Sequence, residues 1–158
     1  MNRLSLFFCL LLVVTPLHAE NQTWYFLRHF EKQGGADPQL SEVGQHRAHK
    51  LVNLLSSHTI SAIYTTDYRR TKQSVTELAA HRGLPIVVYE PSALADFATQ
   101  LATQHNILVV GHSNTTPQLI ALLGGPVFSL SEQDYGVLYI LNKLDGVVTL
   151  REVSVPAQ

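Results

Sequence analysis

The stretch Trp24-Tyr25-Phe26-Leu27-Arg28-His29 decides the fold, because a short apolar run ends abruptly in a guanidinium and an imidazole. A run of this kind predicts a buried β-strand. Gly34, Gly35 and Pro38 follow closely and predict that the strand feeds into a loop. The folded part of the chain is therefore expected to begin with a strand whose carboxyl end carries chemically active side chains.

Beyond this strand, strand patterns and helix patterns alternate along the chain. Further strands are predicted at 62–64, 86–89 and 107–110, and helices after the N-cap Ser41, at 70–81, at 92–105 and after Thr115. Two strand-like runs at 137–141 and 147–153 flank residues 143–146, a pattern typical of a β-hairpin. This order predicts an α/β fold, a three-layer α/β/α sandwich with a mainly parallel sheet and an antiparallel addition at its end.

Residues 1–19 have the pattern of a secretory signal peptide, with the basic Arg3, an apolar run at 4–14 and the small residue Ala19. A run of about a dozen apolar residues is shorter than the roughly 20 that a membrane-spanning helix needs. We therefore expect cleavage after Ala19, export of the protein, most simply to the periplasm, and no stable membrane insertion afterwards. Residues 20–158 are then expected to form one domain.

The overall composition excludes several classes of function. Hydrophobic residues make up 46% and charged residues 15% of the chain, and the formal net charge is -1. With this charge balance, the protein has no strong positive electrostatic field that would attract nucleic acid or an acidic membrane surface. A small anionic substrate remains possible, because it needs only local positive charge. The single cysteine, Cys9, lies within the signal peptide, so the mature protein can have no disulfide and no thiolate nucleophile.

Three of the predicted strands end close to arginine or histidine. Arg28-His29 ends the first strand, Arg69-Arg70 follows the second within a few residues, and Gly111-His112 ends the fourth. Ligands of open α/β sheets bind beyond the carboxyl ends of the strands, so these side chains are expected to share one crevice.

A cluster of two imidazoles and at least two guanidiniums requires an anion. The guanidinium fork matches phosphate oxygens and stays charged. Neutral imidazole can attack phosphorus at neutral pH, because its ordinary pKa is near 6.5 and cationic neighbours lower it further. A second imidazole that the phosphate keeps protonated can donate to an oxygen. The pattern therefore predicts phosphoryl transfer.

Four segments of the chain resemble the signatures of the histidine phosphatase superfamily, also called the phosphoglycerate mutase-like family. Arg28-His29-Phe30-Glu31-Lys32 is similar to its Arg-His-Gly or Arg-His-Ala-Glu signature, and Leu40-Ser41-Glu42-Val43-Gly44-Gln45 to its Leu-Thr/Ser-x-x-Gly-x helix opening. Residues 64–74 resemble its Ser-x-x-x-Arg-Ala-x-Gln-Thr segment, and Gly111-His112-Ser113 its second-histidine motif. The resemblance runs through almost the whole mature chain in the family's order.

This resemblance implies a phosphoglycerate mutase-like fold and a metal-independent phosphatase without a cofactor. His29 would be phosphorylated transiently, and water would then attack the phosphohistidine. The phosphate-binding residues it implies are Arg28, Arg70, His112 and Ser113. The alignment of Gln73 with the family glutamine places the pocket arginine at Arg70, with Arg69 as the alternative.

The chain departs from the family pattern at three positions. Phe30 replaces the usual small residue after the nucleophile and is expected to narrow or dry one wall of the pocket. Thr65 and Thr66 stand where the family has serine, which is a mild change.

Most members of the family also supply an acid that protonates the leaving oxygen. Glu90 and Asp96 are the candidates here, and Glu90, at the end of the third strand, is expected to point toward the crevice. The alternative for Glu90 is a solvated charge at a strand end. Small relatives that act on phosphohistidine need no such acid, because imidazole is already a good leaving group.

Two other hydrolase classes fit the sequence less well. Gly111-His112-Ser113-Asn114-Thr115 resembles the Gly-x-Ser-x-Gly turn of serine esterases, but no histidine follows Ser113 to complete a triad. His46 and His49 are one helical turn apart but have no further metal ligands nearby in the sequence. These two histidines are expected on the outer face of their helix, and three others near helix C-termini are expected to be structural, namely His58, His81 and His105.

The sequence therefore predicts a phosphatase that hydrolyses phosphomonoesters through a phosphohistidine at His29. The alternatives are a non-catalytic phosphate-binding module and a phosphatase of phosphohistidine proteins. A phosphomutase is disfavoured because short loops leave little chain for a lid. The predicted residues recognise phosphate and not its carrier, so the partner is a small phosphorylated substrate or a phosphoprotein. Export suggests envelope phosphoesters such as lipopolysaccharide sugar phosphates.

Overall fold

The computed structural model describes residues 21–158. The predicted signal peptide and its cleavage after Ala19 lie outside the described residues. The strands are β1 (Gln22–Arg28), β2 (Ala62–Thr65), β3 (Ile86–Val88), β4 (Ile107–Gly111), β5 (Val137–Leu144) and β6 (Val147–Ser154). The helices are α1 (Glu42–Leu54), α2 (Arg69–Gln73), α3 (Thr76–Arg82), α4 (Leu94–Leu101) and α5 (Thr115–Leu122).

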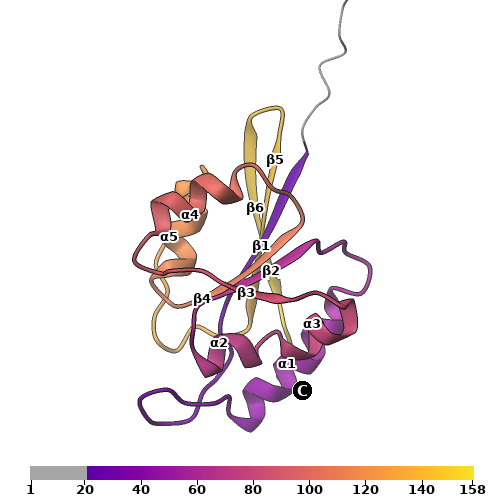
Figure 1. Cartoon of the computed structure of the whole chain (residues 1–158), viewed down its shortest axis with the longest axis vertical. Coiled ribbons are helices and arrows are strands. Elements are labelled where there is room, and N and C mark those ends of the chain that lie inside the picture. Colours follow the sequence, from indigo (N-terminus) through magenta and orange to yellow (C-terminus); the bar gives the residue numbers. More distant parts are fainter. Residues whose placement is uncertain (1–20) are drawn as a thin grey trace, which may run out of the picture.

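The six strands form one sheet in the order β3-β2-β4-β1-β5-β6. The four strands from β3 to β1 pair in parallel, and β5 and β6 add an antiparallel pair beside β1. Helices α1, α2 and α3 lie on one face of the sheet, and α4 and α5 lie on the other (Figure 1). The predicted three-layer α/β fold with a mainly parallel sheet is confirmed.

Two hydrophobic cores lie on the two faces of the sheet. In β1, Tyr25 and Leu27 face the core formed with α1 and α3, whereas Trp24 and Phe26 face the core formed with α4 and α5. This alternation follows from the two-residue period of a strand. Strand β4 is buried along its whole length, as its uninterrupted apolar run predicts.

Helix α1 begins where the sequence predicts. The Ser41 hydroxyl accepts a hydrogen bond from the Gly44 amide at 3.2 Å, which makes Ser41 the N-cap. The same residue ties the helix to the loop after β1, because the Ser41 amide donates to the Glu31 carbonyl at 2.9 Å. The start of α1 is thereby fixed next to the segment that carries His29.

The helix predicted at 70–81 is instead two short helices, α2 and α3, which are separated at Ser74 and Val75. The Ser74 hydroxyl donates back to the Arg70 carbonyl at 2.8 Å and accepts from the Phe30 amide at 3.0 Å. Such a side-chain bond to the preceding turn competes with the helical pattern. The interruption therefore joins α2 to the loop that follows β1.

Two other elements differ in length from their predictions. Helix α4 ends at Leu101, four residues before the predicted end at 105, because a turn and the left-handed residue Asn106 (φ 58°) follow it. The hairpin strands β5 and β6 extend to a tight turn at Asp145 and Gly146, with φ angles of 49° and 81°. Within residues 21–158, none of the helices is both long enough and apolar enough to cross a bilayer.

Candidate active site

The carboxyl ends of β1 and β4 meet at the centre of the sheet. Arg28 is in register with Gly111, and the His29 amide donates to the Gly111 carbonyl at 3.0 Å. This pairing brings the two histidine side chains together, with the ring centroids of His29 and His112 5.6 Å apart. Residues more than eighty positions apart in the sequence thus share one end of the sheet.

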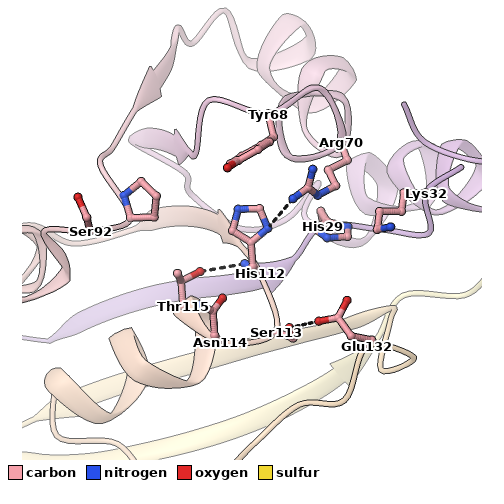
Figure 2. A pocket seen from close by; sticks show the side chains of 11 residues that line it. His29, Lys32, Tyr68, Arg70, Ser92, His112, Ser113, Asn114, Thr115 and Glu132 are labelled. Atoms are coloured by element: carbon pink, nitrogen blue, oxygen red, sulfur yellow. Dashed lines mark hydrogen bonds between the residues drawn. The ribbon is translucent and has the colours of Figure 1, made fainter. Parts of the chain in front are cut away.

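A cavity of about 630 Å³ opens above this end of the sheet (Figure 2). Its lining residues are His29, Lys32, Tyr68, Arg70, Pro91, Ser92, His112, Ser113, Asn114, Thr115 and Glu132. Four of the predicted site residues, His29, Arg70, His112 and Ser113, are among them.

His29 is held in the tautomer that a nucleophile needs. Its Nδ1 lies 2.8 Å from the Phe30 carbonyl oxygen, and because a carbonyl only accepts, Nδ1 carries the proton. The Nε2 atom therefore keeps its lone pair. The pKa of His29 is lowered to about 3, and burial is the largest cause. The hydrogen bond to the Phe30 carbonyl raises the pKa, and the charges of Arg28, His112 and Arg70 add to the lowering. The ring is thus neutral at neutral pH.

His112 is oriented by two neighbours. Arg70 Nη2 lies 3.4 Å from His112 Nδ1, and because arginine only donates, Nδ1 accepts and Nε2 carries the proton toward Thr66 Oγ1 at 2.9 Å. Burial and the charges of Arg70 and Arg28 lower the pKa of His112 to about 4. A phosphate in the cavity would act in the opposite direction and favour the protonated, donating form.

Arg70, rather than Arg69, is the arginine of the cavity. Its guanidinium lies 4.3 Å from the centre of the Tyr68 ring and 3.8 Å from the Asp37 carboxylate. The side chain is 15% exposed, so part of its charge is available to an anion in the cavity. Arg69 is exposed, and its guanidinium donates to Gln39 at 3.2 Å.

Arg28 is not among the residues that line this cavity, in contrast to the sequence prediction. Its side chain is 2% exposed, and its Nη atoms donate to the carbonyl oxygens of Ser131, Glu132 and Asp134 at 2.5, 3.0 and 3.2 Å. The guanidinium also lies 4.2 Å from the centre of the Tyr135 ring. In this structure Arg28 therefore fixes the loop before β5, and its Nε is buried without a hydrogen-bond partner.

Glu90 and Asp96 also lie elsewhere. Both line a separate cavity of about 300 Å³, together with Tyr89 and Phe97. The Tyr89 ring stacks on the Phe97 ring, with ring centroids 4.3 Å apart. The Glu90 carboxylate accepts from the Ser92 amide and hydroxyl instead. Glu90 therefore does not line the phosphate cavity, although its partner Ser92 does, and its role as the acid stays a prediction.

Phe30 likewise differs from its prediction. It is fully buried in the core that α1 and α3 form with the sheet, and it does not line the cavity. Because Leu27 and Leu40 belong to the same core, the ring fills space beneath the loop rather than forming a pocket wall.

Sequence reasoning missed several residues of the cavity. Thr66 does not line the cavity but contacts His112, a role that its place at the serine position of the family segment did not reveal. No local pattern indicated Glu132, whose contact with Arg28 joins residues 104 positions apart. Lys32 and Tyr68 also line the cavity, and they lie next to residues that the motifs did indicate.

The rival hydrolase classes find no support in the geometry. The Ser113 hydroxyl donates to the Glu132 carboxylate, and within residues 21–158 it donates to no histidine, as the serine of a triad would. His46 and His49 are exposed, and His49 lies 2.7 Å from Glu77. Within residues 21–158, no three His, Cys, Asp or Glu side chains are grouped as a metal site requires.

A protein-family model matches part of the chain. Residues 18–91 match the model of the histidine phosphatase superfamily (branch 1), a segment that includes Arg28, His29 and Arg70. No protein of curated function matches the chain in sequence.

Solved structures with the same fold extend the similarity beyond the matched segment. One is a putative α-ribazole-5'-phosphate phosphatase from Escherichia coli, with a TM-score of 0.70 and 18% identity, covering 84% of this chain and 96% of that one. Another is the protein histidine phosphatase SixA complexed with tungstate, with a TM-score of 0.69 and 16% identity over 84% and 97% of the two chains. A mycobacterial glucosyl-3-phosphoglycerate phosphatase has a TM-score of 0.65 and 16% identity over 88% and 100%. At these identities the similarity establishes the fold.

Proposed function

We infer that this chain belongs to the histidine phosphatase superfamily, as the family model and the solved structures support, and we propose that it hydrolyses phosphomonoesters through a phosphohistidine at His29. The neighbours in fold are phosphatases, which supports hydrolysis. The proposal includes independence from metal ions and export to the periplasm. The N-terminal residue of the protein purified from the periplasm, expected to be Glu20, would test the export.

The observation that carries the proposal is the state of His29. A buried imidazole whose Nδ1 is committed to the Phe30 carbonyl has one reactive atom, Nε2. The imidazole lines the same cavity as Arg70 and His112, which supply donors for the oxygens of a phosphate. A module that only binds phosphate would not require a neutral imidazole at this position.

The reaction would proceed in two displacements. In the first, the Nε2 lone pair forms a bond to phosphorus while the bond from phosphorus to the leaving oxygen breaks. In the second, a water oxygen attacks phosphorus, and the bonding pair returns to Nε2. Arg70 and His112 would stabilise charge on the phosphoryl oxygens in both steps.

A second candidate substrate, a phosphohistidine side chain of another protein, is favoured by one observation. The two acids that the sequence offered for protonating a leaving oxygen, Glu90 and Asp96, line a different cavity. A leaving imidazole depends less on such an acid than a leaving alkoxide. The solved structure of SixA belongs to a protein histidine phosphatase.

The test is phosphate release from a panel that includes sugar phosphates, aryl phosphates and a phosphohistidine peptide, with a metal chelator present throughout. We expect wild-type activity to persist with the chelator and H29A to lose about 10³-fold or more in kcat. H46A is the matched control, because His46 is an exposed histidine of α1 and lies away from the cavity.

Two results would contradict the proposal. Equal activity of wild type and H29A would remove His29 from the mechanism. Loss of activity on chelation, restored by a divalent cation, would replace the metal-independent mechanism with a metal-dependent one.

A further inference from the structure

Glu132 is the one carboxylate that lines the cavity together with His29 and His112, among the residues that the structure describes. It lies on the loop between α5 and β5, outside the motifs of the site. Figure 2 shows its side chain at the cavity wall next to Ser113.

The carboxylate is held from two sides. Oε2 accepts from Arg28 Nη2 at 3.0 Å, and Oε1 accepts from the Ser113 hydroxyl. Arg28 also donates to the Glu132 carbonyl oxygen, so backbone and side chain of this residue are bound to the same guanidinium. The Glu132 side chain is nevertheless 75% exposed, which leaves the carboxylate accessible to water.

The buried charge of Arg28 explains why a carboxylate lies here. The Arg28 side chain is 2% exposed and has no other carboxylate within ion-pair distance among residues 21–158. An ion pair offsets part of the cost of burying a guanidinium. The Ser113 hydroxyl and Arg28 both lower the pKa of Glu132, which keeps the group ionised at neutral pH.

An ionised carboxylate suits the second displacement rather than the first. Protonating a leaving oxygen requires an acid in its protonated form, whereas hydrolysis of a phosphohistidine requires a group that takes a proton from water. The other titratable cavity groups are poor acceptors, because Arg70 and Lys32 are cationic side chains and a phosphate in the cavity favours the protonated form of His112.

We propose that Glu132 is the general base that activates water for hydrolysis of the phosphohistidine at His29, an inference that rests on the proposed function. A water O–H bond breaks and its proton moves to the Glu132 carboxylate. The water oxygen forms a bond to phosphorus, and the bond from phosphorus to His29 Nε2 breaks. The imidazole recovers its lone pair, and the carboxyl group returns its proton to solvent.

The test uses E132Q with p-nitrophenyl phosphate under rapid mixing. Nitrophenolate leaves without protonation, so the first displacement should continue at nearly the wild-type rate. We expect a burst of about one nitrophenolate per enzyme, followed by turnover about 10²-fold slower than in wild type. Formate added to E132A should restore part of the turnover, which a merely structural role of Glu132 would not allow.

E152Q is the matched control, because Glu152 is an exposed residue of β6 that lies away from the cavity. Urea unfolding of E132Q and E152Q shows whether each variant is folded. E132D keeps a carboxylate and should turn over faster than E132Q without a burst.

Three results would overturn the assignment. They are unchanged turnover in E132Q, a burst phase slowed as much as the steady state, and a burst that appears in E90Q instead. If H29A is inactive while E132Q turns over normally, only the role of Glu132 fails. If H29A remains active, the proposed function itself fails.

Discussion

His29 shows how burial can keep an imidazole neutral at neutral pH. Desolvation disfavours the charged imidazolium, and it is the largest cause of the lowered pKa. The sequence had suggested neighbouring cations as the cause, and these make a smaller contribution. The direction is the same, so the His29 imidazole is neutral for either reason.

This state of His29 can be measured by ¹⁵N NMR of the histidine rings. We expect the His29 signal to show the Nδ1–H tautomer and to begin titrating only as the pH approaches about 3. The signal is assigned by its absence from an H29N variant. A titration midpoint near 6.5, the ordinary value for histidine, would contradict the burial of the neutral form.

At the scale of elements, the loop that carries His29 and the start of α1 are fitted closely together. The Glu31 carbonyl oxygen accepts from the amide and the hydroxyl of Ser41. A Cβ atom added at Gly44 would overlap this carbonyl oxygen, which is backbone and cannot easily move. Glycine is therefore required at this position, because the Glu31 carbonyl oxygen lies too close to the backbone of α1 to leave room for a side chain.

The variant G44A tests this close approach. We expect G44A to lower the free energy of unfolding by about 1–3 kcal/mol, measured by urea denaturation, because the added methyl group must displace backbone. G34A is the matched control, since a Cβ at Gly34 has no atom within 4 Å and should change stability by less than about 0.5 kcal/mol. Equal stability of the two variants would show that α1 and the loop can separate without cost.

At the scale of the whole molecule, two buried histidines make stability depend on pH. The folded protein holds His29 and His112 neutral down to about pH 3 and about pH 4, whereas the unfolded chain protonates them near 6.5. Between these limits the unfolded state binds more protons than the folded state. The free energy of unfolding therefore rises with pH through this window and falls on acidification.

The urea midpoint of the wild type should accordingly be lower at about pH 5 than at about pH 7.5. The difference should shrink in the H29Q/H112Q double variant, which lacks both buried imidazoles. An equal pH dependence in wild type and double variant would assign the effect to other groups.

The sequence by itself determined the layers of the fold and the part of the site that lies at strand ends. Apolar periodicity is local, so the buried strand β4, the two-sided alternation of β1 and the start of α1 could be read directly. The positions of His29, Arg70 and His112 followed because parallel strands bring their carboxyl ends to one edge. These predictions needed only the order of elements.

The tertiary structure alone decided which donors and which carboxylate belong to the cavity. Arg28 meets Glu132 across 104 positions, and Glu90 lines a cavity with Tyr89 rather than the cavity that His29 lines. The split between α2 and α3 depends on the Phe30 amide, which reaches Ser74 from another part of the chain. Such contacts depend on the conformation of loops and on the direction of side chains, and neither of these produces a periodic pattern in the sequence.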